Sequence, residues 1–486
     1  MSVVKLGRCP DATPGLIGSK AFGINAMLGL GLPVPPGFVL GTDACARYYA
    51  SGHSLANDVK AGLRAGIASL ESEVDRGFGD IDRPLLVSVR SGAACSMPGM
   101  MDTVLNLGIN ARIEPGLRQL GDADYAADTY RRFVTQFRKV VGAEPTEDPW
   151  QQLEAAVAAV FDSWTSPRAV AYRRHHGIGE DGGTAVTVQA MVFGNLDDMS
   201  GSGVVSTRDP VGMGSEPLGE WLPHGQGDDV VSGRCTPRPL TDLADLLPTV
   251  HSELMAAAAL LERAMRDVQD IEFTVESGRL WLLQTRSANR SAAAAVHHAV
   301  AFEREGIVTP AGALAMLTPD QLRVFLRPRL APQARASATV LAAGLVACPG
   351  VACGIVVDNA ATAEDLAGAG TAVILARPTT DPADVRGMLV AQAVITEIGG
   401  ATSHAAVLSR ELNTVCVVGC GEGSLRHLTG RTVTVDAGSG EILDGCLDVE
   451  VPSASSHPDL RVIGQWLESE AGTAHGALKD ILTGAP

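Results

Sequence analysis

A histidine late in the chain stands where chemistry on a phosphoryl group is favoured. The apolar run 393–396 predicts a strand, and Gly399-Gly-Ala-Thr402-Ser403-His404 follows it. Thr402 or Ser403 would cap a helix whose first turn contains His404. The positive end of the helix dipole disfavours the imidazolium ion and attracts phosphoryl oxygens, so His404 should stay neutral and nucleophilic. We therefore expect His404 to become a phosphohistidine, with a structural histidine as the alternative.

Four polar side chains in residues 270–286 have the types that bind a metal ion and a polyphosphate. Two strand-like runs joined by a tight turn predict a β-hairpin there. Because side chains alternate along a strand, the two acids of the first run share one face. The four candidates are Asp270, Glu272, Gln284 and Arg286. The set suits Mg²⁺ and nucleotide phosphates, and a solvated charged face is the alternative.

The register of this hairpin decides which side chains meet. A three-residue loop at 277–279 pairs Glu272 with Gln284. The same loop pairs Asp270 with Arg286, whereas a two-residue loop would move that pair to the opposite face. The proposed site requires the three-residue register. The other face would then be apolar, with Ile271, Phe273, Trp281 and Leu283.

Two cations in the first hundred residues could bind phosphate oxygens. Gly18-Ser19-Lys20 opens a helical pattern, so backbone N–H groups and the Lys20 ammonium could face a phosphate. The apolar run 87–89 predicts a strand that ends at Arg90, where a bidentate phosphate contact is natural. The alternatives are a solvated lysine and a surface turn with a packed pair of methionines.

Hydrophobic patterning predicts the elements that must position these residues. Helical spacing predicts helices over 125–175, and Val/Ile-rich runs predict strands over 184–290. An alanine-rich helix is expected over 291–302, followed by a linker of small residues. Residues 340–447 alternate strands and helices, as in a compact α/β unit, and one amphipathic helix is expected from Val462 to about Leu482.

The composition predicts a soluble multidomain protein and narrows its partners. Its 486 residues are 46% hydrophobic, which excludes a disordered chain and suggests roughly two to four domains. With 55 acidic and 38 basic residues the net charge is −17, which argues against nucleic acid or an anionic membrane as the main partner. We find no signal peptide and no membrane span in the sequence, so a cytoplasmic location is expected.

The cysteines agree with that location. There are nine, none spaced as C-x-x-C, and the neighbours of Cys353 and Cys416 are apolar, which predicts buried, reduced thiols. A zinc site at Cys348/Cys353 or Cys416/Cys420 is disfavoured.

Several segments together resemble pyruvate, phosphate dikinase over roughly residues 5–450. The stretch 87–108 contains Ser-Met-Pro-Gly-Met-Met-Asp-Thr, which distinguishes the dikinases from the water-using phosphoenolpyruvate synthases. Residues 186–233, 344–354 and 399–421 also resemble that family. The sequence differs mildly from the residues common in that family at five positions, which are His224, Gly225, Asp228, Ile398 and Ala401.

The resemblance implies an α/β and α+β multidomain fold. An ATP-grasp nucleotide-binding domain would occupy residues 1–330, with a helical insert at about 120–180. A linker at 331–340 would lead to a swivelling β/β/α-type phosphohistidine domain at 341–450. A C-terminal connector and helix would follow at 451–486.

The resemblance also implies roles for individual residues. The catalytic residues would be His404, Arg90 and Arg286. The ATP-binding residues would be Lys20, Arg90, Asp270, Glu272, Gln284 and Arg286, with Gln189 and Met191 at the adenine hinge. The Mg²⁺ ligands would be Glu272, Asp270 and Gln284. Further matching polar positions are Arg208, Glu220 and Gln226. Thr402 matches a residue that a regulatory kinase phosphorylates in parts of the family, and a dianion there would repel phosphoryl transfer.

The implied function is phosphotransfer from MgATP, with inorganic phosphate, to His404 and onward to pyruvate, giving phosphoenolpyruvate. The family's (β/α)₈ barrel would need several hundred further residues, so we expect a separate barrel protein to bind pyruvate and phosphoenolpyruvate. The alternatives are a phosphoenolpyruvate synthase-like or other small-molecule ATP-dependent phosphotransferase, and a non-catalytic nucleotide-binding regulatory remnant. The sequence leaves open whether the chain forms a homo-oligomer.

Overall fold

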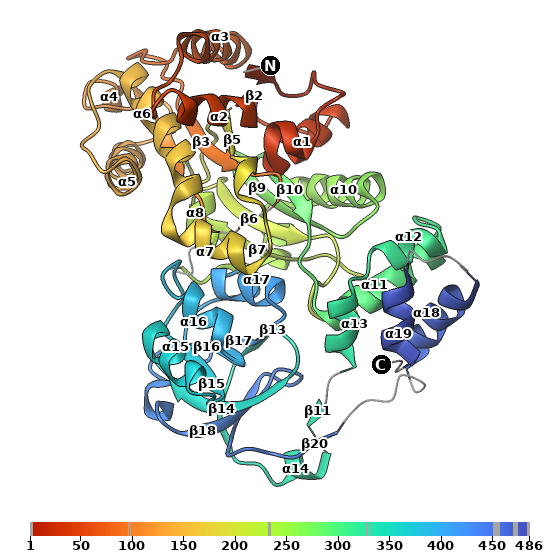
Figure 1. The fold of residues 1–486 in the computed structure, drawn as a ribbon. Helices are drawn as coiled ribbons and strands as arrows, with labels where there is room; N and C mark the ends of the chain where they lie inside the picture. The colour runs from red at the N-terminus through yellow and green to blue at the C-terminus, as the bar shows by residue number, and fades with distance from the viewer. Residues whose placement is uncertain are drawn as a thin grey trace.

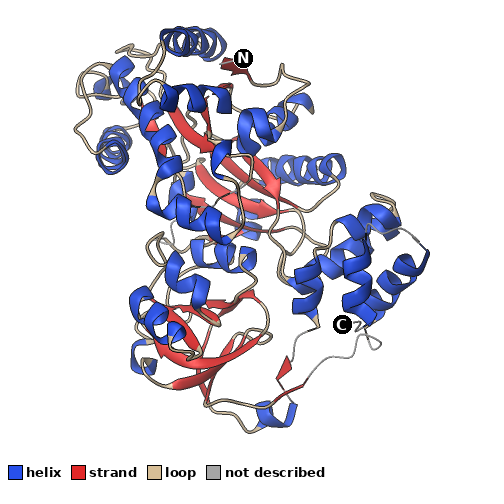
Figure 2. Cartoon of the chain, viewed as in Figure 1, coloured by secondary structure: helices blue, strands red, loops and turns tan. Residues whose placement is uncertain are grey.

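The computed structural model describes residues 3–95, 97, 99–231, 235–326, 329–330, 332–450, 457–469 and 475–483. The strands of this part of the chain form four sheets (Figure 2). Two five-stranded sheets lie in residues 3–287, and an eight-stranded sheet lies in residues 340–444. A helical unit stands beside them, on the right in Figure 1.

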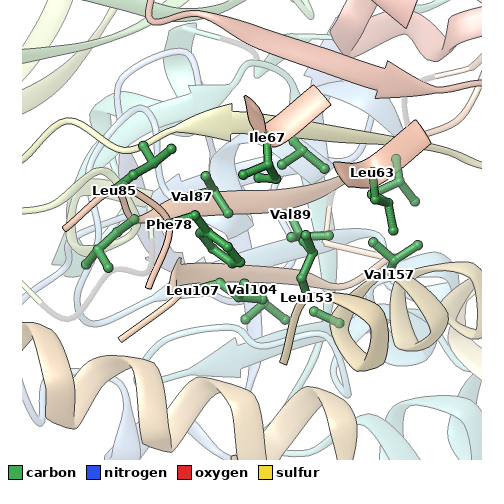
Figure 3. Close-up of a cluster of buried hydrophobic side chains, with 14 of the residues drawn as sticks. Leu63, Ile67, Phe78, Leu85, Val87, Val89, Val104, Leu107, Leu153 and Val157 are labelled. Atoms are coloured by element: carbon green, nitrogen blue, oxygen red, sulfur yellow. The ribbon is translucent and has the colours of Figure 1, made fainter. Parts of the chain in front are cut away.

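The first five-stranded sheet is antiparallel, in the order β1-β2-β5-β3-β4. Its strands are β1 (Val3–Lys5), β2 (Gly37–Leu40), β3 (Val87–Gly92), β4 (Thr103–Leu107) and β5 (Ala185–Ala190). The helices that follow or separate them are α2 (Thr42–Ala50), α3 (Asn57–Val74), α4 (Glu114–Leu117), α5 (Ala123–Val141) and α6 (Pro149–Asp162). Figure 3 shows Leu63 of α3 and Leu153 of α6 in one core with Val89 of β3. This core fixes the strand that contains Arg90.

The second five-stranded sheet has the order β10-β9-β6-β7-β8. Its strands are β6 (Gly201–Ser206), β7 (Leu218–Pro223), β8 (Arg238–Pro239), β9 (Gln269–Glu276) and β10 (Arg279–Ser287). The helices of this part are α1 (Pro14–Gly29), α8 (Gly227–Val231), α9 (Leu240–Leu246) and α10 (Pro248–Met265). Ile24 of α1 and Leu254 of α10 are buried in its core with Phe273 of β9. Because α1 contacts β3 and β5 as well as β10, Lys20 lies where the two sheets meet.

The hairpin of β9 and β10 pairs the predicted residues through an unpredicted turn. Its loop has two residues, Ser277 and Gly278, with φ of 48° and 75°, so the predicted three-residue loop is wrong. A β-bulge between Leu282 and Gln284 then shifts the register by one residue. The resulting cross-strand partners are those predicted: Glu272 with Gln284, and Asp270 with Arg286.

The same turn changes the apolar face of the hairpin. Leu280 and Leu282 are buried, whereas Trp281 and Leu283 are only half-buried, so the prediction for these two residues is wrong. Between the turn and the bulge, the two-residue loop shifts the strand register by one residue. Side chains of β10 that were expected on the buried face therefore lie on the opposite face. The exposed side of Trp281 is covered by the Arg279 guanidinium, 4.0 Å from the ring centroid.

The eight-stranded sheet has the order β12-β19-β18-β14-β15-β16-β17-β13, and its strands β14 to β17 run parallel. The strands are β12 (Val340–Ala343), β13 (Leu345–Cys348), β14 (Val351–Val357), β15 (Val373–Arg377), β16 (Ala393–Thr396), β17 (Val415–Val418), β18 (Thr432–Asp436) and β19 (Glu441–Asp444). The helices are α15 (Ala360–Gly368), α16 (Val385–Val390), α17 (His404–Glu411) and the 3₁₀-helix η3 (Arg426–Leu428). In Figure 1, α17 lies next to α7 (Pro167–His175), which with η1 (Ser163–Thr165) and η2 (Glu180–Gly182) follows α6.

The segments that lead into and out of this sheet run side by side. β11 (Arg329–Leu330) pairs with β20 (Val449–Glu450), and α14 (Pro332–Ala336) lies in the expected linker. The helical unit combines α11 (Ala292–Arg304), α12 (Pro310–Ala315) and α13 (Pro319–Phe325) with α18 (Pro458–Ser469) and α19 (Gly476–Thr483).

The prediction of one amphipathic helix over 462–482 is wrong. A continuous helix would separate Gly464 from Leu482 by about 27 Å, at about 1.5 Å per residue. A Cβ at Gly464 would instead lie 3.5 Å from Leu482 Cδ2, since α18 and α19 fold back on each other. Residues 470–474 lie outside the described residues.

The prediction of reduced thiols is wrong for Cys353, which forms a disulfide with Cys446. Cys353 lies in β14 and Cys446 follows β19, on the two sides of β18, and their Cα atoms are 5.5 Å apart. The thiols of Cys348 and Cys416 are buried. No helix in the described ranges is long and apolar enough to cross a membrane. The cytoplasmic location stays a prediction.

Candidate active site

A cavity of about 1760 Å³ lies where the two five-stranded sheets meet the eight-stranded unit. It is larger than the roughly 300–1,000 Å³ of a typical small-molecule pocket. The predicted residues that line it are Lys20, Glu220, Asp270, Glu272, Gln284, Arg286, Thr402 and His404. The fold therefore brings residues that are far apart in the sequence into one site.

Arg90 connects the first sheet to the hairpin, behind the cavity wall. Its Nη2 donates to Glu272 Oε2 and to Gln284 Oε1, both at 3.0 Å. The Arg90 side chain is 13% exposed, whereas that of Glu272 is 37% exposed. The guanidinium therefore orients the two oxygen-bearing side chains that face the cavity.

Asp270 and Arg286 form the second pair of the hairpin. Arg286 Nη2 lies 3.4 Å from Asp270 Oδ2, and Ser206 Oγ donates to Asp270 Oδ1 at 2.6 Å. Since both residues line the cavity with Glu272 and Gln284, the predicted polar face exists as a unit.

Lys20 is held in place by the start of α1. Gly18 has φ of 78° and breaks the helical conformation, and a Cβ there would overlap the carbonyl oxygen of Gly92. Ser19 N donates to the Ala93 carbonyl oxygen at 2.8 Å, which ties α1 to the end of β3. Burial, and then the Arg90 guanidinium, lower the pKa of Lys20 to about 8. The site thus contains a buried ammonium group, whose positive charge a nearby phosphate would stabilise.

His404 is the first residue of α17, as the capping pattern predicts. Of the two candidate caps, Ser403 is the one that accepts, from Ala406 N at 3.4 Å. His404 Nδ1 lies 3.2 Å from Thr380 Oγ1, and Nε2 is buried with no partner among the described residues. Burial lowers the pKa of His404, and the nearby Asp381 only partly opposes this. A neutral ring with one free nitrogen is the form that attacks phosphorus.

The free nitrogen points to the loop that follows β3. A Cβ at Gly99, which has φ of 69°, would lie 2.9 Å from His404 Nε2. Arg168 of α7 holds this loop through its Nε, which donates to the Met100 carbonyl oxygen at 3.0 Å, and through Asp102. The loop belongs to the motif at 87–108, of which Ser96 and Pro98 lie outside the described residues.

Thr402 reaches across to the second sheet. Its Oγ1 donates to Glu220 Oε2 of β7. The residue predicted as a regulatory site is therefore part of the contact between the start of α17 and the second five-stranded sheet.

Comparison with known proteins agrees with this geometry. Residues 14–242 match the model of the pyruvate phosphate dikinase AMP/ATP-binding domain, and residues 370–440 match the mobile domain of PEP-utilising enzymes. The pyruvate, phosphate dikinases of Rhizobium meliloti, Clostridium symbiosum and Zea mays (dikinase 2) are 38%, 37% and 38% identical over 93% of this chain. The chain is a homologue of the pyruvate, phosphate dikinases. It spans 58%, 59% and 58% of the length of these three relatives.

The dikinase relationship covers both halves of the candidate site. Lys20 and Arg90 lie within the AMP/ATP-binding match, and His404 lies within the mobile-domain match. The fold accordingly combines an ATP-grasp-type nucleotide domain with a phosphohistidine domain, as predicted.

Some residues matched to the dikinases do not reach the cavity lining. Gln189 is 2% exposed, and its Nε2 donates to the Pro35 carbonyl oxygen at 3.0 Å. Met191 packs, partly buried, on the core of the first sheet. Arg208 forms a buried ion pair with Glu262 at 2.8 Å and a second pair at 2.6 Å with Glu305, whose side chain is exposed. These contacts support the fold around the site, and the role of Gln189 and Met191 at an adenine hinge stays a prediction.

Thr380 is a site residue that the sequence did not reveal. It follows β15, which lies beside β16 and runs parallel to it. The carboxyl ends of parallel strands meet at one edge of a sheet, so the loop after β15 must lie beside the loop that leads to His404. The order of the strands in the sheet would have predicted that Thr380 lies beside His404, whereas the spacing of residues in the sequence could not.

Proposed function

We propose that the chain catalyses the nucleotide half of a pyruvate, phosphate dikinase reaction. ATP would donate its β-phosphoryl group to His404 and its γ-phosphoryl group to inorganic phosphate. The observation that supports this most is the buried Nε2 of His404, which has no hydrogen-bond partner among the described residues. The His404 side chain lines the cavity together with Lys20 and Arg286. The names of the relatives support the reaction class.

The bonds balance in two steps. Nε2 of His404 attacks the β-phosphorus, and the bond from that phosphorus to the bridging oxygen of AMP breaks. Inorganic phosphate then takes the terminal phosphoryl group, which leaves phosphohistidine and releases pyrophosphate. The attack requires a proton on Nδ1, and Thr380 Oγ1, 3.2 Å away, can accept a hydrogen bond from it.

The cationic side chains would stabilise the charge that spreads over the phosphoryl oxygens. Lys20 and Arg286 line the cavity, and Arg90 lies behind Glu272 and Gln284. Such positioned charges supply most of the catalysis in phosphoryl transfer. Each would act on ATP directly or, in the case of Arg90, through the side chains that it orients.

The donor set fits an Mg²⁺ ion that arrives with ATP. Asp270, Glu272 and Gln284 present carboxylate and amide oxygens on one face, and Mg²⁺ is held by one or two carboxylates together with substrate phosphates. No group of three or more His, Cys, Asp or Glu side chains suited to a metal occurs in the described ranges. An Mg²⁺ ion that enters the site already bound to ATP needs only a few protein oxygens, and it would neutralise part of the phosphate charge.

We also propose pyruvate as the final acceptor, because the relatives are named for it.

Thr402 is the candidate regulatory residue. Its hydroxyl contacts the Glu220 carboxylate, so a phosphate on Thr402 would lie beside that carboxylate. Like charges repel, so phosphorylation of Thr402 by a regulatory kinase would separate α17 from β7 and inhibit transfer.

The test is labelling from ATP that carries ³²P at the β-phosphate, with Mg²⁺ and inorganic phosphate. We expect acid-labile, alkali-stable label in the wild type and none in His404→Asn, while His427→Asn, at an exposed position of the same unit, keeps it. No label in the wild type, or equal label in His404→Asn, would overturn the proposal. Release of the terminal group of ATP as inorganic phosphate, instead of as pyrophosphate, would favour synthase-like chemistry.

A further inference from the structure

The nucleotide unit and the eight-stranded unit share one apolar cluster. Met97, Met100 and Tyr172 on the nucleotide side pack in this cluster with Ala405 and Leu408 of α17. In Figure 1, α7 and α17 lie directly against each other. The cluster holds the two units in a docked arrangement, with His404 at the nucleotide site.

A polar contact crosses this apolar interface. Tyr172 of α7, 1% exposed, donates from its hydroxyl to Glu411 Oε1 of α17. Glu411 Oε2 is buried and has no hydrogen-bond partner in the part of the chain that the structure describes. The carboxylate therefore depends on Tyr172 to offset the loss of water.

The contact lies at the end of α17 opposite to His404. Thr402, just before the helix, contacts Glu220, and Glu411 is the last helical residue. The helix has eight residues and is therefore about 12 Å long. A contact near each end fixes the direction of the helix, and with it the position of His404.

We propose that Tyr172 and Glu411 are positioning residues that hold the His404 helix in its docked place, and that protonation of Glu411 strengthens this docking. The catalytic consequence rests on the proposed function of His404, whereas the docking itself does not.

The protonation state of Glu411 should change when the units separate. Burial raises the pKa of docked Glu411, and the hydrogen bond from Tyr172 and the charge of Arg286 offset this only in part. After separation the carboxyl meets water and returns to its ordinary pKa of about 4.3. The docked form thus binds a proton more tightly, so docking should strengthen as the pH falls from neutral.

The other groups at this contact are Tyr172, His176, Arg286 and Cys95. Burial raises the pKa of Tyr172, so the phenol remains a donor. The ring of His176 lies 4.3 Å from that of Tyr172, and burial lowers its pKa. This lowered pKa opposes docking at low pH, and its contribution is the same in the wild type and in Glu411→Gln. Arg286 of β10 contributes a fixed positive charge, and Cys95, after β3, faces Tyr172.

Amide hydrogen exchange of α7 and α17 measures docking without nucleotide. The wild type is compared with Glu411→Gln at about pH 5, just above the ordinary carboxyl pKa, and at about pH 8. The ratio at each pH cancels the intrinsic exchange rate. We expect the wild type to exchange faster relative to Glu411→Gln at the higher pH. A ratio that is the same at both pH values would overturn the proton linkage.

Tyr172→Phe removes the donor and leaves the carboxylate buried. Exchange in α17 should rise about tenfold, the usual effect of losing one hydrogen bond to a charged group. Tyr130→Phe in α5 and Glu364→Gln in α15, away from the interface, are the matched controls. Unchanged exchange in Tyr172→Phe, with β5 still protected, would overturn the docking contact.

The rate of His404 labelling is the second measurement. Tyr172→Phe should lower the rate at saturating ATP about tenfold with little change in the KM for ATP, because the nucleotide site is untouched. Faster exchange with an unchanged labelling rate would overturn the positioning role. An unlabelled wild type would instead overturn the proposed function, and the exchange result would still decide whether the contact exists.

Discussion

Lys20 makes the phosphate site sensitive to pH. Its pKa is lowered from 10.5 to about 8, chiefly by burial, and one pH unit corresponds to about 1.36 kcal/mol. The protein therefore disfavours the ammonium by roughly 3 kcal/mol relative to water. A triphosphate beside Lys20 adds negative charge and should raise this pKa again. ATP binding above pH 8 should then take up a proton, and the affinity should fall as the pH rises.

Calorimetry in two buffers of different ionisation enthalpy counts these protons. About half of the Lys20 side chains are neutral at pH 8 and about nine-tenths at pH 9, so uptake of about 0.5 and about 0.9 protons is expected. Lys20→Gln should abolish the uptake and weaken binding about tenfold or more. Lys139→Gln, at an exposed position of α5, should behave as the wild type. No uptake at pH 9, or equal uptake in Lys20→Gln, would refute the reasoning.

Two further substitutions test how the fold positions the site. Gly18→Ala should lower the free energy of unfolding by more than about 2 kcal/mol, because its positive φ and the Gly92 carbonyl leave no room for a Cβ. Gly29→Ala, with open space around it, is the control and should be neutral or slightly stabilising in the same denaturant titration. Arg208→Ala should cost about 3–5 kcal/mol, since it leaves Glu262 buried without its partner, yet the ATP affinity should remain near that of the wild type. Equal stability of the two glycine variants, or loss of ATP affinity in Arg208→Ala, would contradict these roles.

The sequence alone predicted the main polar side chains of the site, because each of them follows a pattern set by its near neighbours in the chain. The cap before His404, the strand that contains Arg90 and the alternation around Glu272 are set by neighbouring residues. The loop of the hairpin was mispredicted because a period of two cannot show a bulge at Leu283. The real loop is one residue shorter than predicted, and the bulge adds one residue back. The pairs of Glu272 with Gln284 and Asp270 with Arg286 are therefore the predicted ones.

Contacts between distant segments were beyond the sequence. The apolar spacing continues from α18 into α19, and the pair Gly472 and Gly476 at their junction was the sign of an interruption. The Tyr172–Glu411 contact joins residues 239 positions apart, and nothing in either segment indicates that the two meet. The disulfide of Cys353 requires the segment after β19 to cross β18, where Thr434 Oγ1 donates to the Gly445 carbonyl oxygen and accepts from Leu447 N.

The central claim is that one cavity joins nucleotide chemistry to His404. The most direct test compares the His404 peptide after incubation with β-labelled and with γ-labelled ATP, together with Mg²⁺ and inorganic phosphate. We predict that the β-label stays on His404 with AMP as the product, while the γ-label leaves as pyrophosphate. Label retained from the γ-phosphate with ADP as the product, or no label on that peptide, would contradict the account.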